Sequence, residues 1–155
     1  MSNELQNFLA EGVVKAAADL EAAFARIPAD KREWAPADTS RSALDQMAEC
    51  AILNTYSAKT IQTRTWDADG GMEGYFKAKA EAVEKGWGYI EPLFKESVQK
   101  VSAALKDFPT DALHDPIETT FGTMKMTQIL GYPYWNTIYH EGQINYIASI
   151  LGTLD

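Results

Sequence analysis

The sequence predicts an all-α fold, an up-down-down-up four-helix bundle with one long crossing connection and a short extra helix. Three observations support this class. Apolar residues recur at steps of three and four along four long stretches, Pro and Gly punctuate the connections, and no stretch forms a convincing strand. The sequence has no internal repeat and no low-complexity tract, so residues 1–155 are interpreted as one helical domain.

The first two helices are predicted over about residues 3–27 and 42–63. In the first, Leu5 and Phe8 begin an apolar stripe that continues until Pro28 stops the helix. The second starts at Ser42, because residues 42–45 resemble a capping box with Asp in place of the usual Glu. Glu49 lies at the border of its apolar face, where periodicity alone favours a solvated charge. The WDADGG segment, residues 66–71, is interpreted as a turn-rich loop.

The second half of the chain is predicted to contain a shorter helix over residues 72–85 and a long helix over about residues 89–108. Residues 110–121 have no helical period, and the IETTF segment within them fits either a short extended segment or a crossing loop. One or two helical turns are expected over residues 124–130, ending at Gly131. The last helix is expected over residues 133–151, with Pro133 near its start and Gly152 just past its end.

This last helix has the most site-like arrangement in the sequence. Asn136 and His140 are one turn apart, and the helical period places both on the face that also holds Ile144 and Ile147. His140 is therefore expected to point inward. Of the residues next to it in sequence, Gln143 is expected to bend inward, and Tyr139 and Glu141 outward.

Composition excludes several classes of partner and compartment. The formal net charge is -8, from 22 acidic and 14 basic residues, which opposes binding to nucleic acid and to anionic membranes. Cys50 is the only cysteine, so no internal disulfide is possible. The N-terminal residues do not resemble a signal peptide, and no run approaches the roughly 18 apolar residues of a membrane span. We therefore expect a cytoplasmic protein, in which Cys50 is a small buried group rather than a nucleophile.

Two stretches resemble a known family. SALDQMAECAILN, residues 42–54, and NTIYHEGQINYIASILG, residues 136–152, are similar to the second and last helices of the DinB-like superfamily of four-helix bundles. The most specific element is YHEGQINYI, in which a His is followed two residues later by Gly-Gln-Ile near the end of the chain. The resemblance implies a helical bundle and a homodimer.

The resemblance also implies a metal site, but an incomplete one. Members of this superfamily commonly hold a divalent metal with three histidines, one in the second helix and two, four residues apart, in the last. These positions fall on Glu49, Asn136 and His140 here, so only one histidine remains. Asn136 offers only a neutral carbonyl, a weak ligand for zinc or nickel, and we expect the metal to be absent or weakly bound. His114 matches no motif position and is interpreted as a surface residue.

Three functional hypotheses stay open at this point. The first is a metal-dependent hydrolase or thiol S-transferase, with Glu49 and His140 as catalytic residues and a small molecule or thiol as substrate. The second is a metal-free ligand-binding or homodimeric interaction bundle, in which Glu49, Asn136 and His140 form a hydrogen-bonded cluster. The third is a pocket for a small apolar or aromatic ligand, with tryptophans as its walls. The alternative is that the tryptophans are packing residues, and that Trp34 is a lid over the end of the bundle. The four tryptophans are Trp34, Trp66, Trp87 and Trp135.

Overall fold

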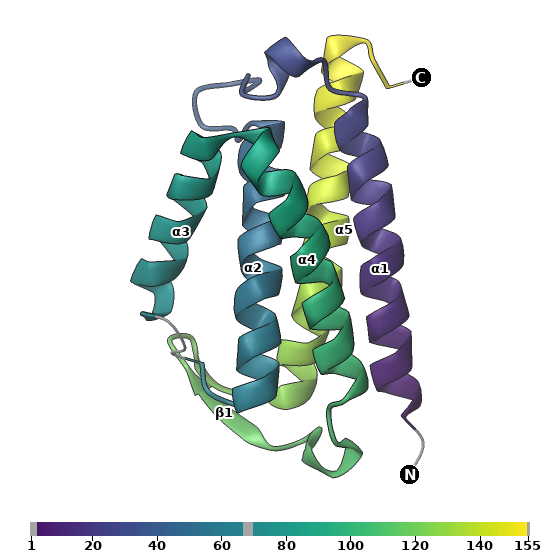
Figure 1. Ribbon diagram of the computed structural model, residues 1–155, viewed down its shortest axis with the longest axis vertical. Helices are drawn as coiled ribbons and strands as arrows, with labels where there is room; N and C mark the ends of the chain where they lie inside the picture. Colours follow the sequence, from purple (N-terminus) through teal and green to yellow (C-terminus); the bar gives the residue numbers. More distant parts are fainter. Residues whose placement is uncertain (1–2, 67–69, 155) are drawn as a thin grey trace.

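The computed structural model describes residues 3–66 and 70–154, and within them it forms a four-helix bundle. The bundle consists of α1 (Glu4–Ala25), α2 (Ala43–Thr63), α4 (Trp87–Lys106) and α5 (Met126–Leu151). In Figure 1, α1 and α5 run upward and α2 and α4 run downward, so the predicted up-down-down-up class is confirmed. Residues 67–69 of the expected WDADGG loop lie outside the described part of the chain.

The short extra helix is α3 (Gly71–Lys85), which returns the chain between the two downward helices. It packs on α2 and α4, whereas α1 and α2 each pack on both α4 and α5. The left-handed Gly86, with φ of 77°, lets the chain end α3 and begin α4 one residue later. The connection between α2 and α4 is therefore built largely from α3, and α3 covers one side of α2.

The crossing segment before α5 contains a small antiparallel hairpin. Strands β1 (Pro116–Thr119) and β2 (Gly122–Lys125) pair with Ile117 opposite Met124. Of the two interpretations left open for the IETTF segment, the extended one is therefore correct for its first half. Ile117 is the buried residue of β1, and the partly buried Met124 of β2 also packs against the core, so both strands anchor the hairpin on the end of the bundle.

The α5 helix differs from the prediction, because it is one continuous helix from Met126 and not two pieces separated near Gly131. Gly131 and Pro133 both lie inside it. Its first amide groups find non-local partners: the Met126 N–H donates to the Asp115 carbonyl, and the Thr127 N–H donates to the Leu113 carbonyl, each at 3.0 Å. These bonds satisfy donors that a helix start normally leaves free, and they fix the start seven residues before Pro133.

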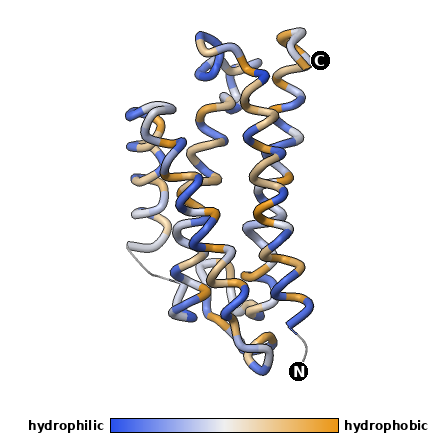
Figure 2. Tube along the Cα trace, turned by 45° about the vertical axis from the view of Figure 1, so that its right-hand side comes forward, coloured by the Kyte–Doolittle hydropathy of each residue, from blue (hydrophilic) through white to orange (hydrophobic). Residues whose placement is uncertain are grey.

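The core lies between the four long helices, and Figure 2 shows how hydrophobic positions recur along them. The predicted stripe of α1 is buried from Leu9 to Ile27, but Leu5 and Phe8, which we expected in it, are exposed. At that level Gln6 faces inward, and the Phe8 ring packs edge-on against Tyr134, with centroids 6.0 Å apart. Among the described residues, no helix has both the length and the apolar character needed to cross a bilayer.

Candidate functional site

The predicted inward face of α5 meets α2 at His140. The ring Nε2 of His140 lies 3.1 Å from Oε1 of Glu49, and the imidazole is only 1% exposed. The Glu49 side chain is 17% exposed, so it is not the solvated charge that periodicity alone favoured. Since a carboxylate can only accept, Nε2 donates its hydrogen to Glu49. The structure therefore brings together two of the three residues that the sequence singled out.

The other ring nitrogen of His140 contacts two glutamine side chains. Nδ1 lies 3.0 Å from Oε1 of Gln46 and 3.0 Å from Oε1 of Gln143. Gln143 bends inward as expected, whereas the sequence analysis missed Gln46, which is buried on α2 one turn before Glu49. With two glutamine side chains at Nδ1 and the Glu49 carboxylate at Nε2, the His140 ring is held in one orientation. Gln46 lies three residues before Glu49, a step that places both side chains on the same face of a helix, so this spacing could have predicted Gln46 as a site residue.

Two cations that the sequence analysis did not identify complete the cluster around Glu49. Arg41 Nη2 lies 2.7 Å from Oε2 of Glu49, and Lys79 Nζ lies 3.9 Å from the same oxygen. Asp45 pairs with both cations, with its Oδ1 lying 3.3 Å from Lys79 Nζ. Burial alone would raise the pKa of Glu49, but the hydrogen bond from His140 and the charge of Arg41 outweigh it and lower the pKa to about 2. Glu49 is therefore held as a carboxylate.

Asn136, the third predicted site residue, faces a different neighbour. It is 2% exposed, and its Nδ2 lies 3.8 Å from Sγ of Cys50. Within the described chain no hydrogen bond joins Asn136 to Glu49 or His140, so of the three-residue cluster considered above the structure forms the contact between Glu49 and His140. Burial raises the pKa of the Cys50 thiol, and the nearby Glu49 charge raises it further. This agrees with Cys50 as a buried thiol rather than a nucleophile.

The donor set does not fit a tight zinc or nickel site. Such sites use at least three protein ligands, and here Glu49 and His140 supply two while the Asn136 amide turns to Cys50. The described residues contain no group of three or more His, Cys, Asp and Glu side chains placed to hold a metal. A divalent ion at Glu49 would also lie beside the Arg41 guanidinium, whose positive charge repels a dication about twice as strongly as it repels a singly charged group. Weak or absent metal binding stays a prediction that rests on these donors and charges.

A cavity of about 450 Å³ opens beside Glu49, between α2, α3, the hairpin and the start of α5. Glu49 is the one charged residue among the described residues that line it. Six of the fifteen described lining residues are aromatic, and neighbouring rings contact each other, such as Tyr56 with Tyr75 and Trp66 with Phe121. The aromatic lining residues are Tyr56, Trp66, Tyr75, Phe76, Phe121 and Tyr132.

Of the four tryptophans considered as pocket walls, Trp66 lines this cavity and the other three do not. Trp34 packs against the core, which agrees with its interpretation as a lid over the bundle end. Trp87 packs on Phe24, with ring centroids 4.4 Å apart, and Trp135 lies on the surface of α5. His114 is exposed, as expected.

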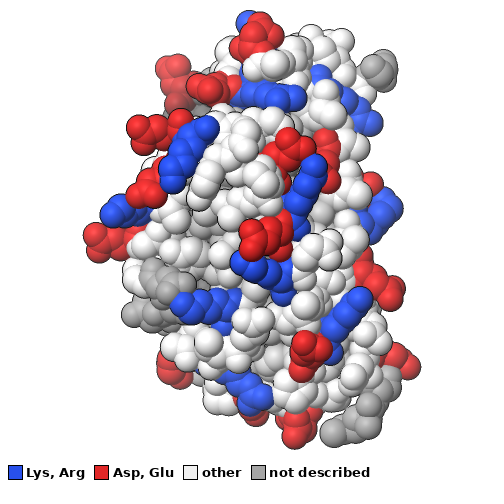
Figure 3. Space-filling view, viewed as in Figure 1, with Lys and Arg blue, Asp and Glu red and all other residues white. Residues whose placement is uncertain are grey.

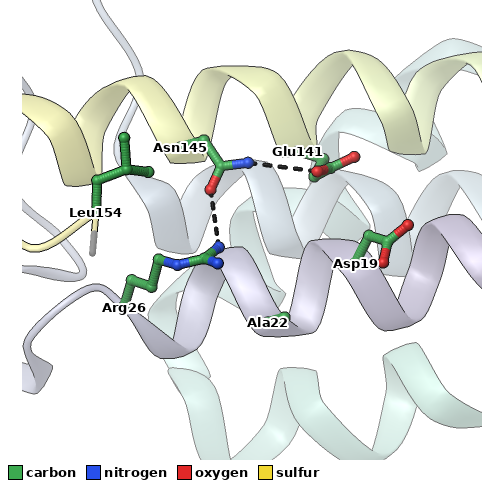
Figure 4. Close-up of a pocket in the computed structure, with 6 residues that line it drawn as sticks. All are labelled: Asp19, Ala22, Arg26, Glu141, Asn145 and Leu154. Carbon is green, nitrogen blue, oxygen red and sulfur yellow. Dashed lines mark hydrogen bonds between the residues drawn. The ribbon is translucent and has the colours of Figure 1, made fainter.

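A second, shallower pocket lies on the surface between α1 and α5 (Figure 4). Here Arg26 Nη1 donates to Asn145 Oδ1 at 3.1 Å, and Asn145 Nδ2 donates to Glu141 Oε1 at 3.3 Å. The polar groups of this pocket thus bond to one another across the two helices. We interpret it as a surface link between α1 and α5, because it has neither the buried polar cluster nor the aromatic wall of the first pocket.

The arrangement of the long helices in this bundle is shared with solved structures of other proteins. The solved structures that share this fold include the mycothiol-dependent maleylpyruvate isomerase and its histidine-to-alanine variant, each with a TM-score of 0.73 at 12% sequence identity. They also include YjoA, a DinB-like protein from Bacillus subtilis, with a TM-score of 0.68 at 16% identity. The resemblance in fold stated from the sequence is therefore confirmed.

The extent of these matches differs. The alignment covers 93% of this chain in each case, but only 61% of the isomerase against 91% of YjoA. No protein-family model matches the sequence, and no curated protein matches it. At these identities the likeness establishes the fold alone, so activity has to be argued from the site.

Proposed function

We propose that this DinB-like bundle binds a small, mainly aromatic molecule in the cavity beside Glu49, without a metal ion. The observation that supports this proposal is the cavity itself, since its volume of about 450 Å³ and its aromatic walls are typical of small-molecule sites. A single carboxylate at one edge gives such a pocket a polar end. The ligand would stack on the aromatic walls and direct a hydrogen-bond donor at Glu49.

The charge state of Glu49 favours binding over proton transfer. Because its pKa is about 2, the carboxylate is a weak base at neutral pH and a poor group for abstracting a proton. It is also held in place by His140 and Arg41, at 3.1 and 2.7 Å. A fixed, ionised acceptor discriminates between ligands by charge, so we expect amines to bind better than carboxylates of the same shape.

This preference can be tested with phenethylamine and phenylacetate, two aromatic probes that differ in the sign of their charge. Trp66 lies in the pocket wall, so saturable binding should change the intrinsic tryptophan fluorescence. We expect phenethylamine to bind at least tenfold more tightly than phenylacetate at neutral pH. Glu49→Gln should remove most of this preference, and Phe76→Ala should weaken both probes because it removes part of the wall. Absence of saturable binding by either probe would contradict the proposal.

The second candidate function is the metal-dependent hydrolase or thiol S-transferase. It is favoured by the position of the His140–Glu49 pair at the pocket edge and by the fold shared with a mycothiol-dependent isomerase. Elemental analysis of protein purified without a metal-binding tag separates the two candidates. One equivalent of zinc or nickel, lost in His140→Ala, would replace the first proposal with this one.

A further inference from the structure

The cavity beside Glu49 runs along about three turns of α2. At a rise of 1.5 Å per residue, Thr60 lies about 16 Å along the α2 axis from Glu49. Phenethylamine spans only about 7 Å from its nitrogen to the far ring carbon, given bonds of about 1.5 Å. It therefore covers less than half of the length of the cavity. The α2 residues that line the cavity lie on one face of the helix, and they are Glu49, Leu53, Tyr56, Ser57 and Thr60.

The two ends of the cavity are formed by different parts of the chain. At one end, called the Glu49 end, Oε2 of Glu49 lies 3.9 Å from Nζ of Lys79 on α3. At the other, called the hairpin end, Trp66 follows α2 and contacts Phe121, which lies between the two strands, with ring centroids 6.0 Å apart. Figure 1 shows α3 beside α2, with the hairpin near the end of α2 that is far from its start.

The cavity is charged at the Glu49 end only, since Glu49 is the single charged residue among its described lining residues. Its middle is lined by Leu53 and by the rings of Tyr75 and Tyr132. Burial and the nearby Glu49 charge raise the pKa of the Tyr75 phenol, so this ring stays neutral. By contrast, the outer face seen in Figure 3 intersperses acidic and basic side chains. A second charge on a ligand would lose water in the cavity without meeting an opposite charge, so the body of the ligand should be uncharged.

A hydrogen-bond donor lies at the hairpin end. Gln128, in the first turn of α5, lines the cavity, and its Oε1 accepts the backbone N–H of Lys125 at 2.9 Å. This bond fixes the orientation of the amide, because the amide nitrogen cannot accept. Nε2 of Gln128 is therefore left as a donor at this end, and the group that it binds on a ligand is an acceptor.

We propose that the ligand of this cavity is an elongated aromatic amine with a carbonyl group at its far end. The ammonium group lies at Glu49, the apolar body runs along α2 past the tyrosine rings, and the carbonyl oxygen accepts from Nε2 of Gln128. This inference rests on the proposed function, because it assumes that the cavity binds a donor at Glu49. It adds the length of the ligand and a second polar group.

A series of phenylalkylamines tests the length of the ligand by isothermal titration calorimetry. From phenethylamine through phenylbutylamine to phenylhexylamine, we expect binding to tighten about tenfold for each two methylene groups, because each leaves water for the apolar wall. Thr60→Phe fills the hairpin end and should remove this gain.

The outcomes separate this inference from the proposed function. Saturable binding of phenethylamine with no gain in the longer probes would overturn the inference and leave the proposed function standing. A gain that persists in Thr60→Phe would also overturn the inference, since the added methylene groups would then lie elsewhere. Absence of saturable binding by every probe would overturn both.

A matched pair of probes tests the carbonyl end. The para-acetyl and para-isopropyl derivatives of phenylhexylamine have the same charge and nearly the same shape, but only the acetyl probe carries an acceptor. Gln128→Glu keeps an oxygen for the Lys125 N–H and removes the donor, so the affinity ratio of the acetyl to the isopropyl probe should fall about fivefold. Gln99→Glu, at an exposed position of α4, adds the same charge outside the cavity lining and should leave the ratio unchanged. An equal ratio in the wild-type chain and in Gln128→Glu would overturn the assignment of the carbonyl end.

Discussion

Glu49 and the groups around it form a cluster in which each charge has a partner inside the protein. His140 bonds to one carboxylate oxygen and Arg41 to the other, while Asp45 and Lys79 join the same network. Such a cluster costs desolvation of its charges, which is offset only when every partner is present. The carboxylate therefore contributes to stability in its ionised form, and that contribution depends on pH.

At this scale we expect the effect of Glu49→Gln on stability to depend on pH. The pKa of Glu49 is lowered from 4.5 to about 2 in the folded chain, so its contribution is fully present above pH 4.5 and disappears as the pH falls toward 2. Glu49→Gln should cost on the order of 2 kcal/mol at pH 7 and progressively less below pH 4.5. Urea unfolding at several pH values measures this difference.

An exposed carboxylate provides the control for this measurement. Glu96 pairs with Lys100 on the surface of α4 and is 61% exposed, so Glu96→Gln should leave stability unchanged at every pH. An equal loss in both variants, or a cost of Glu49→Gln that grows as the pH falls, would show that the ionised Glu49 does not stabilise the folded chain.

The residues of this cluster differ in how far the sequence could predict them. The helical period was enough to place His140 on the face of α5 that also holds Ile144 and Ile147, and the structure buries this face. The partners Arg41 and Lys79 could not be predicted, since they come from the segment before α2 and from α3. Their approach to Glu49 depends on how these segments pack across one another.

At the scale of the element, α5 contains two residues that normally interrupt a helix, but contacts with distant parts of the chain keep the helix continuous. Gly131 and Pro133 predicted a break, because Gly is a poor helix former and Pro cannot donate the helical hydrogen bond. The carbonyls of Leu113 and Asp115 nevertheless hold the helix start at Met126 and Thr127. The helix continues through both residues to Leu151.

Gly131 and Gly12 both lie inside helices, but replacing each of them by alanine should change the stability of the protein differently. A Cβ added at Gly131 would meet nothing within 4 Å, so Gly131→Ala should gain about 1 kcal/mol of helix propensity and raise the melting temperature by about 3 °C. At Gly12 on α1 the same atom would lie 3.1 Å from the Tyr134 ring, so Gly12→Ala should gain less or lose stability. Calorimetry of the two variants checks this order, and a larger gain at Gly12 would contradict it.

For the whole molecule, the polar cluster connects the parts of the bundle that form the pocket. Glu49 on α2, His140 on α5 and Lys79 on α3 meet at the edge of the cavity, and the buried side chains of the four long helices surround them. The positive charge next to Glu49 is supplied by protein side chains. The bundle should therefore hold its shape without a metal ion.

Removing metal ions from the purified protein tests whether the whole bundle stays folded without them. We expect dialysis against EDTA to leave the melting temperature unchanged within about 1 °C, because a resident ion bound only to the native state would contribute several kcal/mol. Added zinc should likewise produce no saturable rise. A fall of several degrees after EDTA treatment, reversed by zinc or nickel, would show that an ion is bound in the native chain.

Apolar periodicity and the capping residue Ser42 were sufficient to predict the four long helices, since these signals act within a few residues of one another. The length and composition of the chain likewise predicted one compact domain. Contacts between distant segments decided the rest: the continuous α5, the hairpin, the turn of Asn136 toward Cys50, and the cations around Glu49. Local patterns determine which face of a helix is apolar, but only packing determines which residues from other helices meet that face.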